Sequence, residues 1–516
     1  MKQFKKYIIT FLLLLTCSLV FAGCSNGTDG DDNDSKEQKV SGGSINIAMD
    51  RYETLNPLLN KDKDVDHVLQ LIYSSLVEID ENLKTQNILA EEVKVDSTCT
   101  SIDVTLKDAK FHDGTKVTAD DVVYSLSTLK NAEDDVIYKN VLGNIANFKA
   151  LDEKTVRIYL RQVYSNPTYC LAFPVVSKAF FTNKDNDLVN GENGTGMFKI
   201  SNVSLNQEIT LENFKDYFGD KPYIDGITVM LMPNEKTALT AFKQKQIDVM
   251  FTEDMIAGQY SGNNTVKLVP YSTLYYDFLG FNFNNSNLAN ADIRKIIAHA
   301  INKKDIIEKA YYGYGLIADT MIHPNSFLYS KSASTYEYDL GMAKSLLNKS
   351  GVSNLSFRIL VNKENEERVE IAKMIKDSLQ AVGFTITIDE VPYETYVQKI
   401  EAKDFDMLLG GWHLLTNQDI SFAYSSSKVY QGQNYISYSN PEMDAKLLNA
   451  YGQVDEEKVL GAFEELQEYL GEELPYISIA FRENVGYLNK NKVGGTLSSV
   501  EHNHYRGIEN IYVKSK

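Results

Sequence analysis

Phe405-Asp406-Met407-Leu408-Leu409-Gly410-Gly411-Trp412 is the stretch that decides how this chain folds. A short apolar run of this length is typical of a buried strand. The two glycines after it predict a sharp turn of the backbone, and the only tryptophan among the 516 residues follows them. Ligands of open α/β sheets bind beyond the carboxyl ends of the strands. The stretch therefore predicts one wall of a ligand pocket, formed by Trp412.

The segments before this stretch alternate between strand and helix patterns. Short apolar runs predict strands, and apolar residues at helical spacing predict helices; in chain order the segments are 357–361, 366–382, 384–388, 392–402 and 405–409. This alternation predicts an α/β fold with a parallel sheet and right-handed crossovers. Trp412 then lies at the carboxyl end of one strand of that sheet.

The first residues have the pattern of an export signal. Lysines at positions 2, 5 and 6 precede an almost wholly apolar segment, 7–21, and small residues lead to Cys24. Small residues directly before a cysteine are typical of a bacterial lipoprotein signal, which is cut before the cysteine that then carries lipid. A plain signal peptide with a nearby cleavage site is the alternative. Residues 25–43 are too polar to form a core, and we interpret them as a disordered tether.

Charge and hydropathy exclude several classes of protein. The net charge of −18 argues against nucleic-acid binding and against electrostatic adhesion to anionic lipid. No apolar run of about 18 residues follows the signal segment, so no other part of the chain is predicted to span a membrane. Two cysteines, Cys99 and Cys170, remain beside Cys17 of the signal and Cys24. In an exported protein they form either a disulfide or two separately buried thiols.

No catalytic motif stands out. The chain has no P-loop, dinucleotide fingerprint or H-E-x-x-H motif, and the glycines of 258–262 have the wrong spacing for a nucleophile elbow. With 70 acidic residues, chance pairs of carboxylates carry no information. His502 and His504 are predicted to lie in a surface loop rather than to bind a metal. We therefore expect no enzyme activity, no cofactor and no metal site.

Several motifs predict where helices begin and end. Thr118 and Asp121 have the spacing of a capping box. Asp292 and Asp339 are each placed to cap a helix, and Gly351 is placed to end the second of these helices. These features predict structural roles rather than a functional site.

Six motifs in a fixed order resemble the family 5 extracellular solute-binding proteins, the peptide- and nickel-binding subunits of ABC importers. They are Leu106–Val122, Gly194–Phe198, Gly280–Phe283, Asp292–Ile301, Tyr338–Leu347 and Tyr438–Asp444. The resemblance covers about residues 44–512. It implies a periplasmic-binding-protein-like α/β fold with two main lobes around a cleft, an additional domain and a discontinuous chain.

The resemblance also implies the domain boundaries. The hinge between the lobes is expected near Leu279 and near Arg482. The predicted parts are a lipoprotein signal peptide (1–23), a disordered tether (24–43), a first lobe (44–66, 187–278 and 486–516), an additional domain (67–186) and a second lobe (279–485).

Trp412 and Asp419 are the principal candidate site residues. Peptide-binding relatives usually place an aspartate three residues after the tryptophan, where it pairs with the ligand's α-ammonium. Here Leu415 holds that position, and Asp419 lies near a second acidic position of the family. Either a small insertion lets Asp419 reach the ammonium, or the ammonium site is lost and the ligand lacks a free amino terminus.

The resemblance implies further ligand-binding candidates near the cleft. His413 adjoins Trp412, and some nickel-binding members use a histidine in this lobe, although a single histidine does not hold a metal firmly. The other candidates are Tyr52 and Glu53 after the first strand, Tyr275 and Tyr276 near the hinge, and Asn434 and Tyr435.

The function implied is capture of a peptide or peptide-like solute by hinge closure. We expect a monomer, anchored through lipid on Cys24 to the outer face of the bacterial cytoplasmic membrane. Its partners would be an ABC permease and, through it, an ATPase. A surface receptor for peptide signals, a binder of a metal chelate and, more remotely, an exported hydrolase are the alternatives.

Overall fold

The computed structural model describes residues 39–183, 186, 192–253, 264–333, 335–429 and 432–515. The predicted signal peptide, Cys24 and the tether up to residue 38 lie outside these described residues. The Gly42 N–H donates to the Tyr223 carbonyl (2.7 Å), and the Asp225 N–H donates to the Gly43 carbonyl (2.8 Å). The last residues assigned to the tether are therefore bound to the folded protein. Within the described ranges, no helix has both the length and the apolar character needed to cross a membrane.

The largest element of the fold is one mixed sheet. Its strands run in the order β15-β14-β16-β12-β17-β11-β1-β10-β9-β8, and β13 pairs with β17 beside this path. The sheet joins strands that we predicted for the first lobe with strands that we predicted for the second. In chain order they are β1 (Ser44–Met49), β8 (Phe198–Ser204), β9 (Glu208–Asn213), β10 (Gly226–Leu231), β11 (Val249–Thr252), β12 (Val266–Phe281), β13 (Gly315–Ile317), β14 (Ser356–Asn362), β15 (Thr385–Val391), β16 (Met407–His413) and β17 (Tyr476–Asn489).

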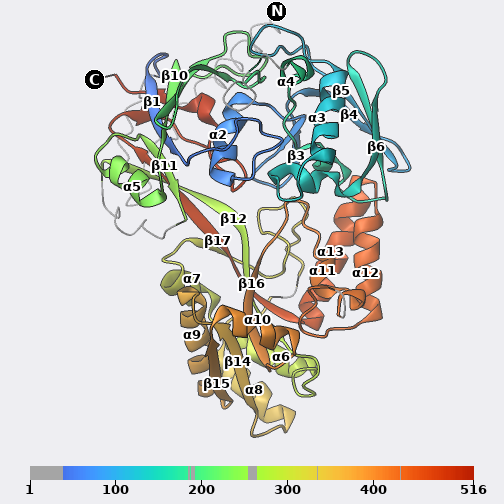
Figure 1. Cartoon of the computed structure of the whole chain (residues 1–516). Coiled ribbons are helices and arrows are strands. Elements are labelled where there is room, and N and C mark those ends of the chain that lie inside the picture. The colour runs from blue at the N-terminus through green and yellow to red at the C-terminus, as the bar shows by residue number, and fades with distance from the viewer. Residues whose placement is uncertain are drawn as a thin grey trace, which may run out of the picture. The chain divides into compact units, whose positions relative to one another are not determined.

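Two long antiparallel strands, β12 and β17, run side by side between the two ends of this sheet (Figure 1). Their pairing stops at Ser272 opposite Glu483 and resumes at Tyr276 opposite Phe481. Residues 273–275 therefore face a single residue, Arg482, as in a β-bulge. We call residues 273–275 and Arg482 the crossing bulge. It lies where the sequence predicted one of the two hinge segments.

The parallel sheet predicted around Trp412 is confirmed. β14 pairs in parallel with β15 on one side and with β16 on the other. The crossover helices are α9 (Glu366–Val382) and α10 (Tyr393–Glu401). Since β16 ends at His413, Trp412 lies at the carboxyl end of a strand, as the apolar run predicted.

The turn predicted at Gly410 and Gly411 is wrong, because both residues lie inside β16. A side chain at Gly411 is excluded by packing instead. A Cβ atom there would overlap the Arg368 Nη2 atom and would lie 2.5 Å from Asp277 Oδ1. The glycine allows a buried ion pair to pack directly on the backbone of β16.

We expect Gly411→Ala to destabilise the protein by about 1–3 kcal/mol, because the added methyl group must displace packed atoms. Chemical denaturation of the two proteins measures this difference. Gly461→Ala is the matched control, since Gly461 lies in helix α13 (Glu456–Glu473) with no atom within 4 Å of the added Cβ. That change is expected to stabilise by about 0.5–1 kcal/mol, because alanine favours helix. Equal effects of the two substitutions would contradict the packing argument.

Most of the predicted helix ends are confirmed. In α3 (Ala119–Asn131), Thr118 and Asp121 form the capping box. In α8 (Leu340–Ser350), Asp339 accepts the Met342 N–H, and Gly351 ends the helix with φ of 68°. Asp292 is not the N-cap of α6 (Ala291–His299). Asn290, two residues earlier, accepts the Asp292 N–H instead, and Asp292 lies in the first turn.

The predicted additional domain contains a separate antiparallel sheet in the order β4-β5-β7-β6. Cys99 and Cys170 are both buried free thiols in it, so the disulfide alternative is not formed in this structure. The elements are β2 (Val77–Ile79), β3 (Thr85–Asn87), β4 (Ala90–Val95), β5 (Ser101–Leu106), α3, η1 (Ile137–Asn144), β6 (Ile145–Ala150), β7 (Thr155–Leu160), η2 (Pro167–Leu171) and α4 (Lys178–Thr182).

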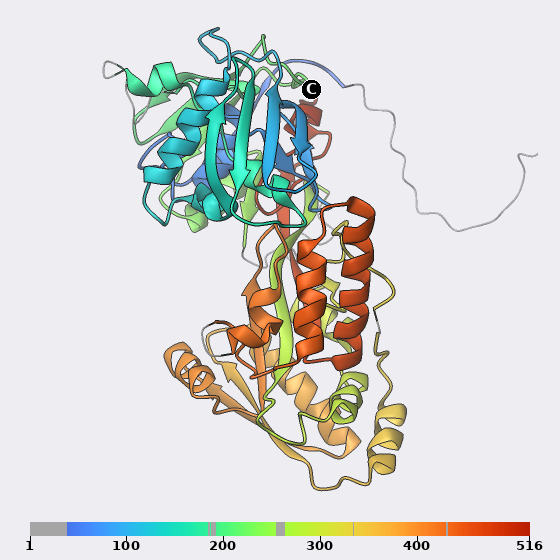
Figure 2. The ribbon, with the colours of Figure 1, turned by 90° about the vertical axis from the view of Figure 1, so that its right-hand side faces the viewer.

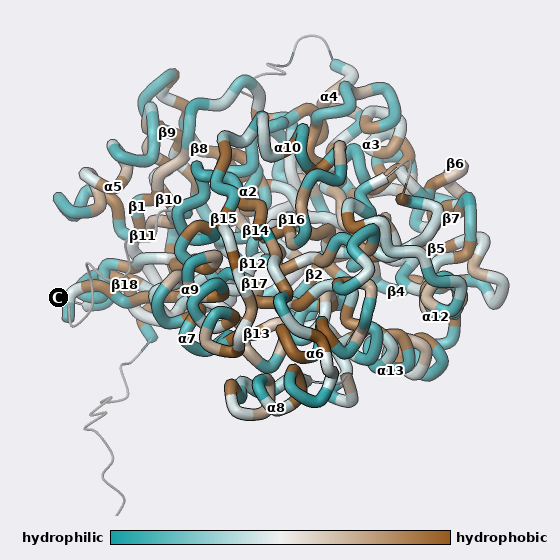
Figure 3. The backbone as a smooth tube through the Cα atoms, turned by 90° about the horizontal axis from the view of Figure 1, so that it is seen from below, coloured by the Kyte–Doolittle hydropathy of each residue, from teal (hydrophilic) through white to brown (hydrophobic). Residues whose placement is uncertain are grey.

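Amphipathic helices complete the fold. Helices α12 and α13 lie side by side (Figure 2). Along α9 and α13, hydrophilic and hydrophobic positions alternate, as expected for helices with one buried face (Figure 3). The remaining elements are α2 (Lys63–Ile72), α5 (Glu235–Lys243), α7 (Lys303–Ala310), α11 (Ser421–Tyr424), η4 (Ser426–Lys428), α12 (Pro441–Gly452), α13 (Glu456–Glu473), β18 (Val493–Gly494), η5 (Ile508–Asn510) and β19 (Tyr512–Val513).

Candidate functional site

Trp412 is held in an aromatic cluster at the carboxyl end of β16. Its ring stacks on Phe278 with centroids 4.1 Å apart, and it meets Phe422 and Tyr476 edge-on at 5.2 and 5.4 Å. The Tyr435 ring lies parallel to it at 6.4 Å. Trp412 remains partly exposed. The ring is thus fixed from several sides and still presents an apolar surface, which suits a rigid wall of a binding site.

The opposite face of the same strand end carries charge. Neighbouring residues of a strand point to opposite faces, so His413 lies away from Trp412 and stacks on Tyr275 at 4.5 Å. His413 Nε2 is 2.6 Å from Glu501 Oε1, and Glu501 Oε2 accepts the Leu274 N–H at 2.6 Å. Burial raises the pKa of Glu501, but His413 and this N–H outweigh it and lower that pKa.

Glu501 was missed by the sequence analysis. Its partner His413 is 88 residues away in the chain, and no local pattern marks the contact. Glu501 comes from the segment predicted for the first lobe, and His413 from the second. The carboxylate also satisfies the backbone of the crossing bulge at Leu274, so it connects three segments.

Asp419 is a partly buried carboxylate beside the start of α11. Its Oδ1 atom accepts the Ser421 N–H at 2.9 Å. Among the described residues it forms no ion pair with a lysine, arginine or histidine. Asp419 contributes, after burial, to the raised pKa values of Tyr164 and Tyr451, whose rings stack at 5.6 Å. The loop therefore holds one negative charge without a described counter-ion.

Leu415, at the position where relatives carry the ammonium-binding aspartate, is 55% exposed. An exposed apolar side chain supplies no partner for an ammonium group. Of the two family positions in this loop, only Asp419 offers a carboxylate.

Tyr276 and Asn434 are fully buried and bonded inside the protein. The Tyr276 hydroxyl is 2.6 Å from Ser478 Oγ. The Asn434 amide donates to the Ser425 and Tyr438 carbonyls at 3.1 and 2.8 Å. Both side chains are therefore buried beneath the proposed binding surface in this structure and are not part of that surface.

The other predicted site residues remain at least partly accessible. Tyr275 and Tyr435 are partly buried next to His413 and Trp412, respectively. Tyr52 packs against the hydrophobic core that the predicted first lobe and the predicted additional domain share, and Glu53 is exposed. The structure thus brings Trp412 close to Tyr435 and brings His413 close to Tyr275. Cys24 lies outside the described residues.

A cavity of about 160 Å³ is lined by residues of the predicted additional domain and of the predicted second lobe. None of the predicted site residues lines it. Lys84 and Glu456 form an ion pair of 2.7 Å on its wall. Its lining residues are Lys84, Thr85, Ser165, Asn166, Pro167, Thr168, Tyr169, Phe327, Val454, Glu456 and Val459.

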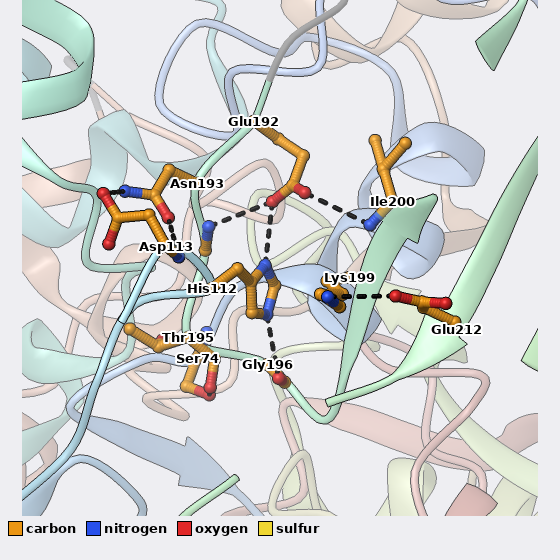
Figure 4. A network of polar contacts seen from close by, with 11 residues as sticks. Ser74, His112, Asp113, Glu192, Asn193, Thr195, Gly196, Lys199, Ile200 and Glu212 are labelled. Atoms are coloured by element: carbon orange, nitrogen blue, oxygen red, sulfur yellow. Dashed lines mark hydrogen bonds and ion pairs between the residues drawn. The ribbon is translucent and has the colours of Figure 1, made fainter. Parts of the chain in front are cut away.

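The motif around His112 has a structural role. His112 Nδ1 is 3.0 Å from Glu192 Oε2, and His112 Nε2 is 3.0 Å from the Gly196 carbonyl (Figure 4). Glu192 also accepts the N–H groups of Gly194 and Ile200. The network is buried and connects the predicted additional domain to the predicted first lobe. We therefore interpret the network as a structural contact between these two predicted domains rather than as a ligand site.

The loop with His502 and His504 is less exposed than the surface loop that the sequence predicted, since both residues are partly buried. The His504 ring stacks between His67, at 3.6 Å, and Phe251, at 4.3 Å. Its Nε2 atom is 3.0 Å from the Tyr271 hydroxyl. Burial lowers the pKa of His504 to about 3, and it lowers that of His67 well below its usual value. No group of three or more metal-ligating side chains occurs in the described part of the chain.

His504→Phe is expected to change the pH dependence of stability. The depressed pKa of His504 means that the unfolded chain binds a proton below about pH 6.5 that the folded chain does not, so wild type loses stability as pH falls. Phenylalanine keeps the stack but loses the bond to Tyr271, at a cost of about 1 kcal/mol at pH 8. By pH 5 the proton linkage reaches about 2 kcal/mol, and the variant becomes the more stable protein.

Melting temperatures of both proteins between pH 8 and pH 5 measure this crossover. Buried acids such as Asp66, whose pKa burial raises to about 7, affect both proteins equally. The difference between the proteins therefore isolates His504. A constant difference across this range would show that His504 has the same pKa in the folded and unfolded states.

Comparisons with known proteins identify the family and the fold. The family model "Bacterial extracellular solute-binding proteins, family 5 Middle" matches residues 84–434. The oligopeptide-binding protein AppA of Bacillus subtilis is 25% identical, over 94% of this chain and 95% of its own length. The glutathione-binding protein GsiB of Salmonella typhi is 23% identical, over 86% of this chain and 90% of its own.

The solved structure of HbpA2 from Haemophilus parasuis has the same fold. It superposes with a TM-score of 0.80 at 20% identity, covering 92% of this chain and all of that chain. The predicted periplasmic-binding-protein-like α/β fold and the family resemblance are both confirmed, and the chain is a binding protein rather than an enzyme. It belongs to the bacterial extracellular solute-binding proteins of family 5.

Proposed function

We propose that this protein is the lipid-anchored substrate-binding subunit of an ABC importer. It captures a peptide or peptide-like solute by closure of its two lobes and delivers it to a membrane permease. Family membership and the near full-length similarity to an oligopeptide-binding protein support this function. The residues before Cys24 support the lipid anchor.

The observation that carries the proposal is a rigid aromatic wall followed, seven residues later in the chain, by a carboxylate that forms no ion pair with the described residues. Trp412 is fixed among aromatic rings at the end of β16, and Asp419 follows it with no described counter-ion. We propose that Asp419 accepts the ligand's ammonium group, because Leu415 offers no partner for that charge and an ammonium buried without a partner costs several kcal/mol. Tyr435, His413, Tyr275, Tyr52 and Glu53 are proposed to complete the binding surface.

Titration of the soluble protein that begins after Cys24 tests this function. Synthetic di- to nonapeptides are added, and Trp412 fluorescence and melting temperature are recorded. We expect a saturable change with at least one length class. N-acetylation of a bound peptide is expected to weaken binding about tenfold or more, since it removes the charge that Asp419 pairs with.

Asp419→Asn should abolish most of the difference between free and acetylated peptides. Asp404→Asn is the control, because Asp404 is a half-exposed carboxylate paired with Arg358. The absence of any saturable response to peptides would contradict the proposal. The anchor is tested separately: Cys24→Ala should release the protein from bacterial membranes and remove lipid detected by mass spectrometry.

A further inference from the structure

One buried carboxylate is shared by two arginines at the crossing bulge. Asp277 is 1% exposed; its Oδ1 accepts from Arg368 Nε and its Oδ2 from Arg482 Nε, each at 2.7 Å. The Tyr311 hydroxyl also donates to Oδ2 at 2.7 Å. Burial raises the pKa of Asp277, but both guanidinium groups and Tyr311 outweigh it and lower that pKa to about 2. Two cations therefore meet one anion, which leaves a net positive charge.

The two guanidinium groups use few of their donors. Each carries five N–H groups, and arginine–carboxylate pairs are often bidentate. Here each arginine contacts Asp277 through Nε alone, and neither makes another side-chain hydrogen bond with the described residues. Arg482 Nη2 is shielded from solvent and has no partner. The side chains of Arg368 and Arg482 are 18% and 24% exposed, so both reach the surface.

The position of these arginines is one where α/β sheets bind ligands. Arg368 lies in the first turn of α9, directly after β14, and Asp277 faces Gly411 of β16. In the order β15-β14-β16, the first crossover runs from β14 to β15 on one side, and the second returns past β14 to β16 on the other. Ligands bind beyond the carboxyl ends of strands at such a switch point. A helix N-terminus adds a favourable field for an anion.

Other charged groups lie close by. Burial raises the pKa of Tyr275, Glu253 and Glu501 raise it further, and Arg482 acts in the opposite direction. Glu501 is paired with His413. Glu367 acts on Arg482 electrostatically, but no ion pair joins them among the described residues. The Arg482 guanidinium also lies over the Tyr311 ring, 5.4 Å from its centroid, but among the described residues no second carboxylate pairs with either arginine.

We propose that Arg482 and Arg368 bind a carboxylate of the solute, so that the protein selects anionic over neutral ligands. This inference rests on the proposed function, because it assigns the substrate class of the same binding protein. The carboxylate comes either from the peptide's carboxyl terminus or from an acidic side chain.

Three matched peptides separate these sources. Ala-Ala-Ala carries a terminal carboxylate, Ala-Ala-Ala-amide carries none, and Ala-Glu-Ala-amide carries one on a side chain; five-residue versions extend the set. Calorimetric titration of the protein should show at least about tenfold tighter binding of a carboxylate form than of the neutral amide. Whichever carboxylate form binds tighter identifies the source.

Arg482→Gln should reduce the preference for the carboxylate form to about twofold or less, and Arg368→Gln should reduce it in part. If Arg482→Gln fails to fold, Arg482→Lys is the alternative variant, because it keeps a positive charge beside Asp277. It should retain only part of the preference, because lysine lacks the planar, forked N–H donors of arginine. Arg358→Gln is the control and should leave the preference unchanged, since Arg358 pairs with Asp389 and Asp404 instead.

Equal affinity of wild type for carboxylate and amide forms would overturn the inference. So would Arg482 variants that lower the melting temperature but keep the full preference, because the arginine would then act only in folding. Binding of none of these peptides, nor of any longer one, would instead overturn the proposed function and this inference with it.

Discussion

Asp277→Asn is expected to destabilise the protein by about 3–5 kcal/mol, the range found when one partner of a buried ion pair is removed. Asparagine keeps the shape of the side chain but removes the charge that neutralises Arg368 and Arg482. Both guanidinium groups then face each other across a neutral amide. The effect should appear as a lower midpoint of urea unfolding and a lower melting temperature.

Asp404→Asn provides the comparison for this prediction. Asp404 also contacts an arginine, Arg358, but its side chain is 50% exposed. Exposed pairs contribute only about 0–1 kcal/mol. Similar losses for the two substitutions would mean that the cluster at Asp277 is solvated and that its surplus charge is screened.

Acid should weaken the same cluster in wild type. The pKa of Asp277 is about 2 in the folded protein, below the usual value of 3.8. A depressed carboxyl pKa stabilises the folded state above pH 4, and that stabilisation is lost as pH falls toward 2. Asp277→Asn should therefore differ most from wild type at neutral pH and least near pH 2.

The second large effect is expected for ligand binding. Trp412→Ala should weaken binding of any peptide that wild type captures by about 2–4 kcal/mol, because a buried aromatic anchor is removed. Trp412→Phe should keep much of the affinity, since phenylalanine can still stack on Phe278. Calorimetry is the appropriate measurement, because both variants lack the only tryptophan.

Tyr393→Ala is the control for this substitution. Tyr393 is an aromatic residue of α10 that is 63% exposed, and it belongs to none of the proposed contacts. Its replacement should leave affinity unchanged. An equal affinity of Trp412→Ala and wild type would remove Trp412 from the binding site and leave it a role in packing alone.

The two faces of the strand end at Trp412 and His413 carry different chemistry. One face is aromatic, with Phe278, Tyr435 and Tyr476 around the indole. The other is charged, with His413 and Glu501 beside the crossing bulge. Apolar contact and charge recognition are thus available within two adjacent residues, and the variants above test them separately.

Local patterns in the sequence predicted much of the second lobe. The parallel order of β14, β15 and β16 follows from short apolar runs alternating with helical spacing, because burial of one face imposes these periods on nearby residues. The caps at Thr118 and Asp339 were predictable for the same reason, since a cap acts within one helical turn. The overall fold was predicted from the motifs that resemble the family 5 solute-binding proteins.

The glycines at 410 and 411 show where such patterns fail. Glycine permits a turn, but it also permits close approach of another side chain, and the sequence alone does not separate these uses. The packing of Arg368 and Asp277 against Gly411 shows that this glycine allows close approach of side chains and does not form a turn. The partial burial of the loop around His504 could not be predicted either, because the stacking partners of His504 are distant in the chain.

By itself, the sequence determined the family, the strand and helix order and the position of Trp412 at a strand end. Only the tertiary structure decided the charges around it. Asp277 meets Arg368 and Arg482 across 91 and 205 residues, and His413 meets Glu501 across 88. Secondary structure depends on contacts a few residues apart, whereas these ion pairs exist because the sheet brings β12, β16, β17 and the C-terminal loop together.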